Sequence, residues 1–340
     1  MPTLYLNGFE TEAHVCRRGV RIDKLNHETE SIDSIRVPLF DIDRVVLIGK
    51  ASVTTPLLQR FIRYNIPVTF LSGHGRWEGT LTPTGNGHAL RRLRQYELAK
   101  NRDFRLDVAR DLIIAKISNS RRVLQRMAAN RDEARIPEQQ KACSELQSLC
   151  TRAAAAESVE TLRGLEGYAG AVYFERLAAF FPDEIPFNGR NRRPPRDAAN
   201  ALMSWTYTIV LSEIDGAVQA AGLDPCFGFL HEISYGRPSL ALDILEPLRA
   251  PLCDMLVLRL LNHRILKTEN FEFNSDDGGT YMTQDARKPY FVEYERTMAR
   301  RFSRAKNQPH TDFRNVIRDQ VHEVLRAQEG HEDPLFFRMP

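Results

Sequence analysis

The sequence lacks the features of secreted, thiolate-zinc and membrane-spanning proteins. Its five cysteines include no C-x-x-C pair and their number is odd, which disfavours a disulfide framework or a zinc site and fits a reducing compartment. No stretch approaches the roughly 20 apolar residues of a membrane-spanning helix. At the N-terminus, no basic segment leads into an apolar run, as it would in a signal peptide. We therefore expect a cytoplasmic protein that has no membrane partner.

A strong bias of charge is also missing. The 340 residues carry a net charge of +3, so only local basic clusters can indicate contact with nucleic acid. Internal repeats and low-complexity tracts are absent as well. The length predicts about two domains, and the hydrophobic content of 42% is ordinary for a globular chain.

The pattern of apolar residues changes near residue 85. Before it, short β-branched segments such as 35–40 and 44–49 predict strands, and Pro56 at the start of a helical repeat predicts one short helix. After it, helical spacing dominates nearly to the end of the chain. The exception is 269–282, where two short strands fit around an Asp-Gly-Gly turn.

These patterns predict an α+β protein, with a small N-terminal β-rich domain followed by a larger, mostly α-helical domain. Gly85 and Gly87 mark the junction as a linker, and the last residues are expected to be frayed. The predicted boundaries are 1–84 for the β-rich domain, 85–90 for the linker, 91–329 for the helical domain and 330–340 for the C-terminal tail.

One acidic segment of the helical region follows closely after a histidine, His231. Asp243 and Glu246 lie three residues apart in an apolar run, so on a helix they share one face. Two carboxylates side by side on a buried helix repel each other and are costly to desolvate. A bound cation or an arginine would relieve both costs, whereas a solvated helix face would need neither.

Glu166 is a further acid in an apolar setting. It lies four residues after Leu162 and three before Ala169, so it leans into the apolar face of its helix. The simpler interpretation is a salt bridge to an arginine at the edge of the core. The same helix contains three glycines, each of which costs about 1 kcal/mol relative to alanine, so another helix or a ligand is expected to approach its backbone. These glycines are Gly164, Gly167 and Gly170.

His231 and the three acids together favour a divalent cation. A single histidine near apolar residues is more often a satisfied core residue than a ligand. One imidazole with two or three carboxylates, however, suits Mn²⁺ or Mg²⁺ better than zinc, and such an ion supports phosphoryl chemistry. Spacing alone does not show that Glu166 meets the other three residues.

Basic clusters lie on both sides of the acids in the sequence. Guanidinium groups suit contact with phosphate, and such contacts make binding depend on salt. Solvated surface is the simpler interpretation of any single cluster. Asn200, close behind one cluster, either orients a ligand or completes the cap of a helix that starts after Asp197. That cluster consists of Arg190, Arg192, Arg193 and Arg196.

Four segments resemble, in the same order, the motifs of a known family. They are Leu165–Phe174 with its glutamate, Arg192–Ala201 with its proline and asparagine, Gly222–His231 with its histidine, and Ser239–Arg249 with its acids. On these motifs the chain resembles, over nearly its whole length, the CRISPR-associated integrase, the metal-dependent DNA endonuclease of spacer acquisition. It departs from the family at Ala198-Ala199, where Pro-Val is common, and at Trp205-Thr206, where Phe-Gly is usual.

The resemblance implies roles for individual residues. Glu166, His231 and Glu246 would be the metal ligands and the catalytic residues, with Mg²⁺ or Mn²⁺ as the cofactor. Asp243 would be an accessory carboxylate. Several further residues would contact the DNA or line its path: Arg190, Arg192, Arg193, Arg196, Asn200, Tyr207 and Arg249.

The resemblance also implies a reaction and partners. The family inserts short DNA fragments as spacers at a CRISPR repeat by transesterification from their 3′-hydroxyl ends, and it acts on double-stranded and branched DNA. It works as a homodimer, with the β-rich domain as the expected dimer contact, together with a small companion protein of the adaptation complex. The size of the chain resembles type I members, and we expect subtype I-C.

Three other functions are compatible with these residues. The chain could be a DNA-binding scaffold of the adaptation complex that does not turn over, a metal-dependent hydrolase of small phosphates, or a helical domain with a structural role only. The intact set of Glu166, His231 and Glu246 disfavours the scaffold. Cleavage of branched DNA, turnover of a nucleotide analogue and uptake of metal would separate these functions.

Overall fold

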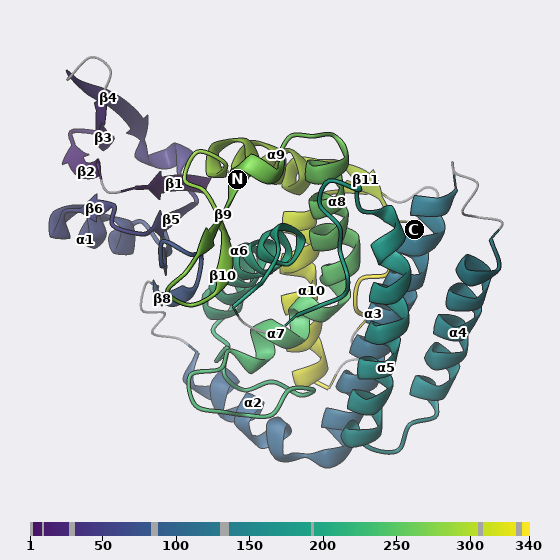
Figure 1. Cartoon of the computed structure of the whole chain (residues 1–340). Coiled ribbons are helices and arrows are strands. Elements are labelled where there is room, and N and C mark those ends of the chain that lie inside the picture. The colour runs from purple at the N-terminus through teal and green to yellow at the C-terminus, as the bar shows by residue number, and fades with distance from the viewer. Residues whose placement is uncertain are drawn as a thin grey trace. The chain divides into compact units, whose positions relative to one another are not determined.

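The computed structural model describes residues 3–8, 10–26, 31–82, 88–129, 136–191, 194–304, 309–330 and 335–340. The chain divides into two compact units, Met1–His88 and Ala89–Pro340. The first unit is β-rich with one short helix and the second is largely helical (Figure 1), so the predicted fold class is confirmed. Within the described ranges, every helix is too short or too polar to cross a membrane.

The first unit contains two four-stranded sheets, in the orders β1-β5-β7-β8 and β4-β3-β2-β6. In the first sheet β1, β5 and β7 run parallel and β8 is antiparallel to β7. The strands are β1 Thr3–Asn7, β2 Thr11–Cys16, β3 Gly19–Asn26, β4 Ser31–Pro38, β5 Arg44–Ile48, β6 Ser52–Val53, β7 Val68–Leu71 and β8 Trp77–Leu81; the helices are η1 Leu39–Asp41 and α1 Thr55–Arg63.

The core of this unit forms where α1 packs on the strands. Every residue of β5 is buried, as is typical of a central parallel strand. Pro56 lies in the first turn of α1, where a missing N–H costs nothing because it would have no helical partner. Leu57 and Phe61, one turn apart on α1, are fully buried in the same cluster as Val45 of β5.

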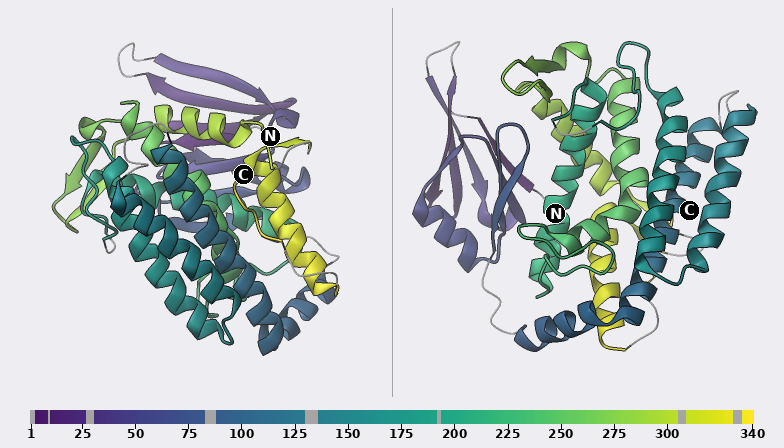
Figure 2. Two further views of the ribbon diagram at one scale, coloured as in Figure 1. Left: turned by 90° about the vertical axis from the view of Figure 1, so that its right-hand side faces the viewer. Right: turned by 60° about the horizontal axis from the view of Figure 1, so that its bottom comes forward.

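The second unit is organised around the long helix α3, which packs against α4, α5 and the segment after α7 (Figures 1 and 2). The predicted two-stranded hairpin is confirmed as β9 and β10. The elements are α2 Ala89–Lys100, α3 Arg102–Ala128, α4 Pro137–Ala154, α5 Val159–Leu177, η3 Ala178–Phe180, α6 Ala198–Ala220, α7 Ser239–Leu245, η4 Glu246–Leu248, η5 Arg249–Asp254, α8 Met255–Asn262, η6 Thr268–Asn270, β9 Phe271–Asn274, β10 Gly279–Met282, α9 Arg287–Ala299, β11 Phe302–Ser303, β12 His310–Thr311 and α10 Phe313–Gln328.

The helical path changes pitch directly after the acidic segment. The α-helix α7 ends at Leu245, and Glu246–Leu248 continue as a 3₁₀ turn that contains Pro247. A proline inside a helix removes a backbone donor, which favours an end or a change of pitch at this point. A π-helical turn, η5, follows, a form that is rare and often found at functional sites.

The expectation of a frayed tail is wrong for residues 335–340. Phe336 and Phe337 are buried, and their N–H groups donate to Asp111 and Gln320. The Asn119 side chain donates to the carbonyls of Phe337 (2.8 Å) and Pro247 (2.7 Å) and accepts from the N–H of Met339 (2.7 Å). Partners distant in the sequence therefore hold the tail in place.

Two predicted segments extend beyond what the structure describes. Residues 85–87 of the predicted linker and residues 331–334 of the predicted tail lie outside the described residues, while Ala89 already belongs to α2. The assignment of the first unit to dimerisation and of the second to catalysis stays a prediction.

Candidate active site

Glu166 and Glu246 come from different elements and meet at one cationic group. Glu166 lies on α5 and Glu246 in the turn after α7. The ammonium of Lys116, on α3, lies between them, donating to Glu166 and, over 2.6 Å, to Glu246. The partner that sequence reasoning expected for Glu166 was an arginine; the structure shows a lysine.

Asp243 fixes the loop that carries His231. Its carboxylate is fully buried and accepts from the N–H groups of Phe229, Leu230 and His231, at 2.6 to 3.0 Å. Gly228 allows this close approach, since a Cβ there would lie 2.6 Å from Asp243 Oδ2 and 2.7 Å from the main-chain carbon of Ser239. The loop therefore wraps a buried acid.

The same carboxylate orients the imidazole of His231. Nδ1 lies 2.7 Å from Asp243 Oδ1, and an ionised carboxylate only accepts hydrogen bonds, so this nitrogen carries the proton. The other nitrogen, Nε2, then presents a lone pair and lies 3.8 Å from Glu246 Oε1. A histidine that is held through one nitrogen by a carboxylate is the usual arrangement of a metal ligand.

Arg163 ties this loop to the helix that carries Glu166. Its guanidinium donates through Nε (3.0 Å) and Nη2 (2.7 Å) to the carbonyl of Leu230 and pairs with Glu232. Since Arg163 precedes Glu166 by three residues on α5, both side chains lie on neighbouring turns of one face. The His231 loop is therefore held next to the glutamate.

The charges at the centre stabilise each other. Burial alone would raise the pKa of Glu246, but Arg249, Lys116 and His231 outweigh this effect and lower the pKa to about 2. Burial alone would lower the pKa of Lys116, but Glu246 and Glu166 raise it above its usual range. Glu246 is therefore ionised and Lys116 protonated at neutral pH.

The donor set fits a hard divalent cation. Lys116 shows that a positive group is stable between the two glutamates, and carboxylates with one imidazole suit Mg²⁺ or Mn²⁺. As the described side chains stand, no three of His, Cys, Asp or Glu converge closely enough to hold an ion. The Lys116 ammonium occupies the space between the carboxylates, so an ion would have to replace it there.

Two glycines of α5, Gly167 and Gly170, border a groove beside Glu166. A Cβ on Gly164, Gly167 or Gly170 would meet no atom of the described residues within 4 Å. Within the described part of the chain no helix packs against these glycines, so their backbone is open to solvent or to a ligand. The adjoining groove has a volume of about 650 Å³ and is lined by Glu166, Gly167, Gly170, Ala171, Phe174, Glu175, Ala178, Phe187, Asn188, Gly189 and Arg190.

Tyr207 lies in the interior and supports two arginines. Its ring lies 5.3 Å from the Arg190 guanidinium and 4.7 Å from that of Arg249, and its hydroxyl donates to Asp254 Oδ1 over 2.5 Å. Tyr173 donates to the other oxygen of Asp254. Burial raises the pKa of Asp254 to about 6, against the effect of these two hydrogen bonds.

The predicted DNA-contact residues differ in their exposure to solvent. Asn200 and Tyr207 are buried; Asn200 bonds to Arg190, Asp197 and the carbonyl of Gly189, which is the capping network considered above. Arg196 is exposed. Arg192 and Arg193 lie outside the described residues.

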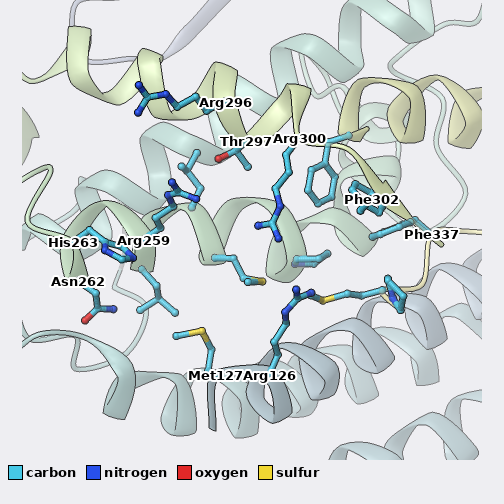
Figure 3. A pocket seen from close by; sticks show the side chains of 17 residues that line it. Arg126, Met127, Arg259, Asn262, His263, Arg296, Thr297, Arg300, Phe302 and Phe337 are labelled. Atoms are coloured by element: carbon cyan, nitrogen blue, oxygen red, sulfur yellow. The ribbon is translucent and has the colours of Figure 1, made fainter. Parts of the chain in front are cut away.

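A second hollow of the same unit contains none of the predicted site residues. It has a volume of about 340 Å³ and an apolar wall that includes Leu256 and Leu258. Figure 3 shows arginine side chains from three segments around it. They are Arg126, Arg259, Arg296 and Arg300. Without an acid–histidine set this hollow is not the candidate active site.

Sequence reasoning missed Lys116, Arg163 and Asp254. Lys116 did carry a signal, because it stands in the apolar run Leu112–Ile117, one helical turn after Leu112 and before Ser120, which are both buried. A lysine on such a face needs an acidic partner. No such signal marked Arg163 or Asp254, whose partners come from other elements.

Comparison with known proteins identifies the family of the chain. The profile of the family described as "CRISPR associated protein Cas1" matches residues 4–296. The chain is 35% identical over 263 residues to a CRISPR-associated endonuclease Cas1 of Thermus thermophilus, covering 77% of this chain and 76% of that one. It is 36% identical over 270 residues to one of Chlorobaculum tepidum, covering 78% of each.

Solved structures show the same fold. A casposase bound to its integration product superimposes with a TM-score of 0.86 at 23% identity, over 100% of this chain and 94% of that one. A Cas6-RT-Cas1–Cas2 complex gives a TM-score of 0.81 at 26% identity, over 98% of this chain and 36% of that one. Since a family profile covers most of its length and relatives above 30% identity cover more than two thirds of it, the chain belongs to the Cas1 family of CRISPR-associated endonucleases.

Proposed function

We propose that this chain is a metal-dependent DNA endonuclease and integrase, which inserts short DNA fragments as new spacers at a CRISPR repeat by transesterification from their 3′-hydroxyl ends. The observation that carries the proposal is the meeting of Glu166 and Glu246 at one positive group, with His231 held beside Glu246 by Asp243. Relatives named as endonucleases and a structural neighbour bound to an integration product support it.

Glu166, His231 and Glu246 would hold one Mg²⁺ or Mn²⁺. When bound, such a cation lowers the cost of charge on the scissile phosphate and orients the attacking hydroxyl. The residues of the chain supply the geometry: Asp243 keeps the proton of His231 on Nδ1 and leaves Nε2 free to bind. Arg249 neutralises part of the Glu246 charge by donating to Oε2 over 3.0 Å.

The groove beside Glu166 would take the DNA backbone. On α5, a Cβ at Gly167 or Gly170 would meet no described atom within 4 Å, so a phosphate chain could approach the helix closely at these glycines. Arg190 lines the groove, and exposed Arg196 lies in the same basic segment. Arg192 and Arg193 belong to that segment by sequence. Contacts of this kind predict binding that weakens as salt increases.

The substrates would be double-stranded and branched DNA, and the chain would act as a homodimer through its first unit. The small companion protein of the adaptation complex is the third expected partner. Two structural neighbours are described as Cas6-RT-Cas1–Cas2 complexes, which supports this expectation.

Cleavage and strand joining of branched DNA in Mn²⁺ test the proposal. The parent protein should act on the substrate, and His231→Ala should lose the activity while it still binds DNA. Arg300→Met, in the second hollow, is the matched control and should keep the parent rate. Equal activity of parent and His231→Ala would refute the role of His231, and no activity in either would favour the DNA-binding scaffold.

A further inference from the structure

Lys116 is a charged side chain enclosed by the site. It is 15% exposed, contacts both glutamates, and projects from α3, which packs against both α5 and η4. The groups around it are Glu166 and Glu246; Arg249 contacts the same oxygen of Glu246 as Lys116 does, and His231 lies near the other oxygen. Nothing in the reaction proposed above uses this lysine.

We propose that Lys116 is a built-in cation that takes the place of the divalent ion between Glu166 and Glu246, assembles the two carboxylates before the ion arrives, and gives up these contacts when the ion binds. This inference rests on the proposed function, because it concerns the same ion. It assigns Lys116 a positioning role that does not require contact with DNA.

The first argument comes from the cost of the site without an ion. Glu246 is 4% exposed, and Glu166 comes to the same point from a different helix. Without a positive group between them, the buried carboxylate of Glu246 would face the negative charge of Glu166, whose side chain is 33% exposed. Lys116 removes this repulsion, so the ligands stand near each other in the metal-free protein.

The second argument separates Lys116 from the other cation at the site. Arg249 donates to Glu246 over 3.0 Å and its guanidinium lies 4.7 Å from the centre of the Tyr207 ring, so packing fixes it. A lysine is a point charge on a flexible stem of four carbons and can swing away more easily than a stacked arginine. Lys116, not Arg249, is therefore the group that the ion displaces.

If the ion displaces Lys116, the two cations compete for the carboxylates, and the direction of the effect on ion affinity can be predicted. A lysine that stabilises the metal-free site more than the metal-bound site weakens the binding of the ion, and its removal strengthens it. The same removal destabilises the metal-free protein, because the carboxylates are left without a counter-charge. Saturating ion should cancel that loss of stability, since the ion then supplies the charge.

Lys116→Met tests both effects on the full-length protein. Calorimetry with Mn²⁺ alone should give a dissociation constant about tenfold or more below that of the parent. Thermal unfolding should show a lower midpoint than the parent without Mn²⁺ and a much smaller difference with saturating Mn²⁺. Lys116→Arg keeps the charge, so it should unfold close to the parent without Mn²⁺ and should show no gain in Mn²⁺ affinity.

Arg126→Met is the control. It removes one positive charge from the same helix, at the second hollow, where Figure 3 shows its side chain. Ten residues along a helix correspond to about 15 Å, so it should leave the Mn²⁺ affinity unchanged. A gain in affinity as large as that of Lys116→Met would mean that overall charge, and not displacement, causes the effect.

The outcomes distinguish this inference from the proposed function. If the parent binds Mn²⁺ and Lys116→Met binds it equally or more weakly, the inference is wrong and the proposed function stands. If the parent and Glu166→Gln both fail to bind Mn²⁺, the proposed function itself is wrong. Should Lys116→Met not fold, the double variant Lys116→Met/Glu166→Gln should fold, because one carboxylate is gone; if it also fails, Lys116 is needed for packing and the inference falls.

Discussion

The candidate active site with its adjoining groove, named the first hollow, and the second hollow both include a residue of α3, Lys116 in the first and Arg126 in the second. They differ in how their charges are matched. At the first, the Lys116 ammonium lies between two glutamates, and Asp243 holds the imidazole of His231. At the second, the carboxylate of Glu293 pairs with both Arg259 and Arg296. Among the described residues, no carboxylate forms an ion pair with Arg126 or Arg300 at that second hollow.

The difference shows what a reactive site requires. The second hollow has a volume of about 340 Å³, within the usual range of ligand pockets, and an apolar wall. Its arginines could contact a phosphate, but no carboxylate lines it among the described residues, so it has no set of ligands for a metal ion. The first hollow combines ionised donors with a buried setting, where electrostatic effects are strong. Paired opposite charges therefore indicate the candidate active site better than the enclosed volume of a hollow does.

The largest expected effect separates the two hollows directly. His231→Ala should lower the rate of DNA cleavage by about 10²-fold or more, because it removes a ligand whose second nitrogen is already oriented. Arg300→Met should leave the rate unchanged. Single-turnover cleavage at saturating protein measures both, and a comparable loss in the two variants would break the distinction between the hollows.

The acid stability of the protein should depend on the first hollow. The pKa of Glu246 is about 2 against the usual 4.5, so its ionised form stabilises the folded protein above the usual value, and this contribution is lost as pH falls toward 2. The full contribution is on the order of 3 kcal/mol. Denaturant unfolding of the parent and of Glu246→Gln at about pH 6 and about pH 3.5 checks this.

The decrease in stability between these pH values should be smaller in Glu246→Gln, by roughly 1 kcal/mol or more. An identical decrease in both proteins would show that Glu246 is not held ionised by its neighbours.

Two glycines sharpen the comparison within the first hollow. Gly228→Ala places a methyl group 2.6 Å from Asp243 and 2.7 Å from the Ser239 backbone, so it should cost roughly 1–3 kcal/mol of stability. The loop should shift and weaken the binding of Mn²⁺ as well. Urea unfolding and calorimetry measure the two effects; unchanged stability would mean that the loop does not need its close approach to Asp243.

Gly167→Ala should have the smallest effect, in the opposite direction. Its Cβ would meet no described atom, so the variant should be about 0.5–1 kcal/mol more stable, as alanine favours a helix interior. The added methyl group should nevertheless weaken DNA binding if the backbone of α5 lies against phosphate. A fluorescence titration with duplex DNA measures this effect. Equal affinity of Gly167→Ala and the parent would mean that the DNA does not lie against α5.

The sequence predicted the fold class and the acidic segments because these depend on local patterns. The β-branched segments 35–40 and 44–49 predicted strands, and helical spacing predicted the second unit. The motifs around Glu166, His231 and Glu246 predicted residues that the structure brings to one place, although their roles as ligands stay predictions. The turn chemistry of Asp277-Gly-Gly predicted the hairpin correctly.

Long-range partners account for what the sequence did not show. Lys116 meets its two acids only after α3, α5 and α7 have packed, and Arg163 reaches the carbonyl of Leu230 across a loop. Asn200 and Tyr207, expected along the DNA path, are buried beneath arginines. The prediction of a frayed tail was wrong because Asn119 and Gln320, which hold the tail, are remote from it in the sequence.

The amide of Asn119 gives this tail a wider importance. It joins the carbonyl of Pro247, the neighbour of Glu246, to the main chain at Phe337 and Met339. Trimming the chain after residue 334 would thus leave the amide with one of its three partners and loosen the turn that carries Glu246. A protein shortened at this end would then have a weakened candidate active site, although none of the residues of that site had been changed.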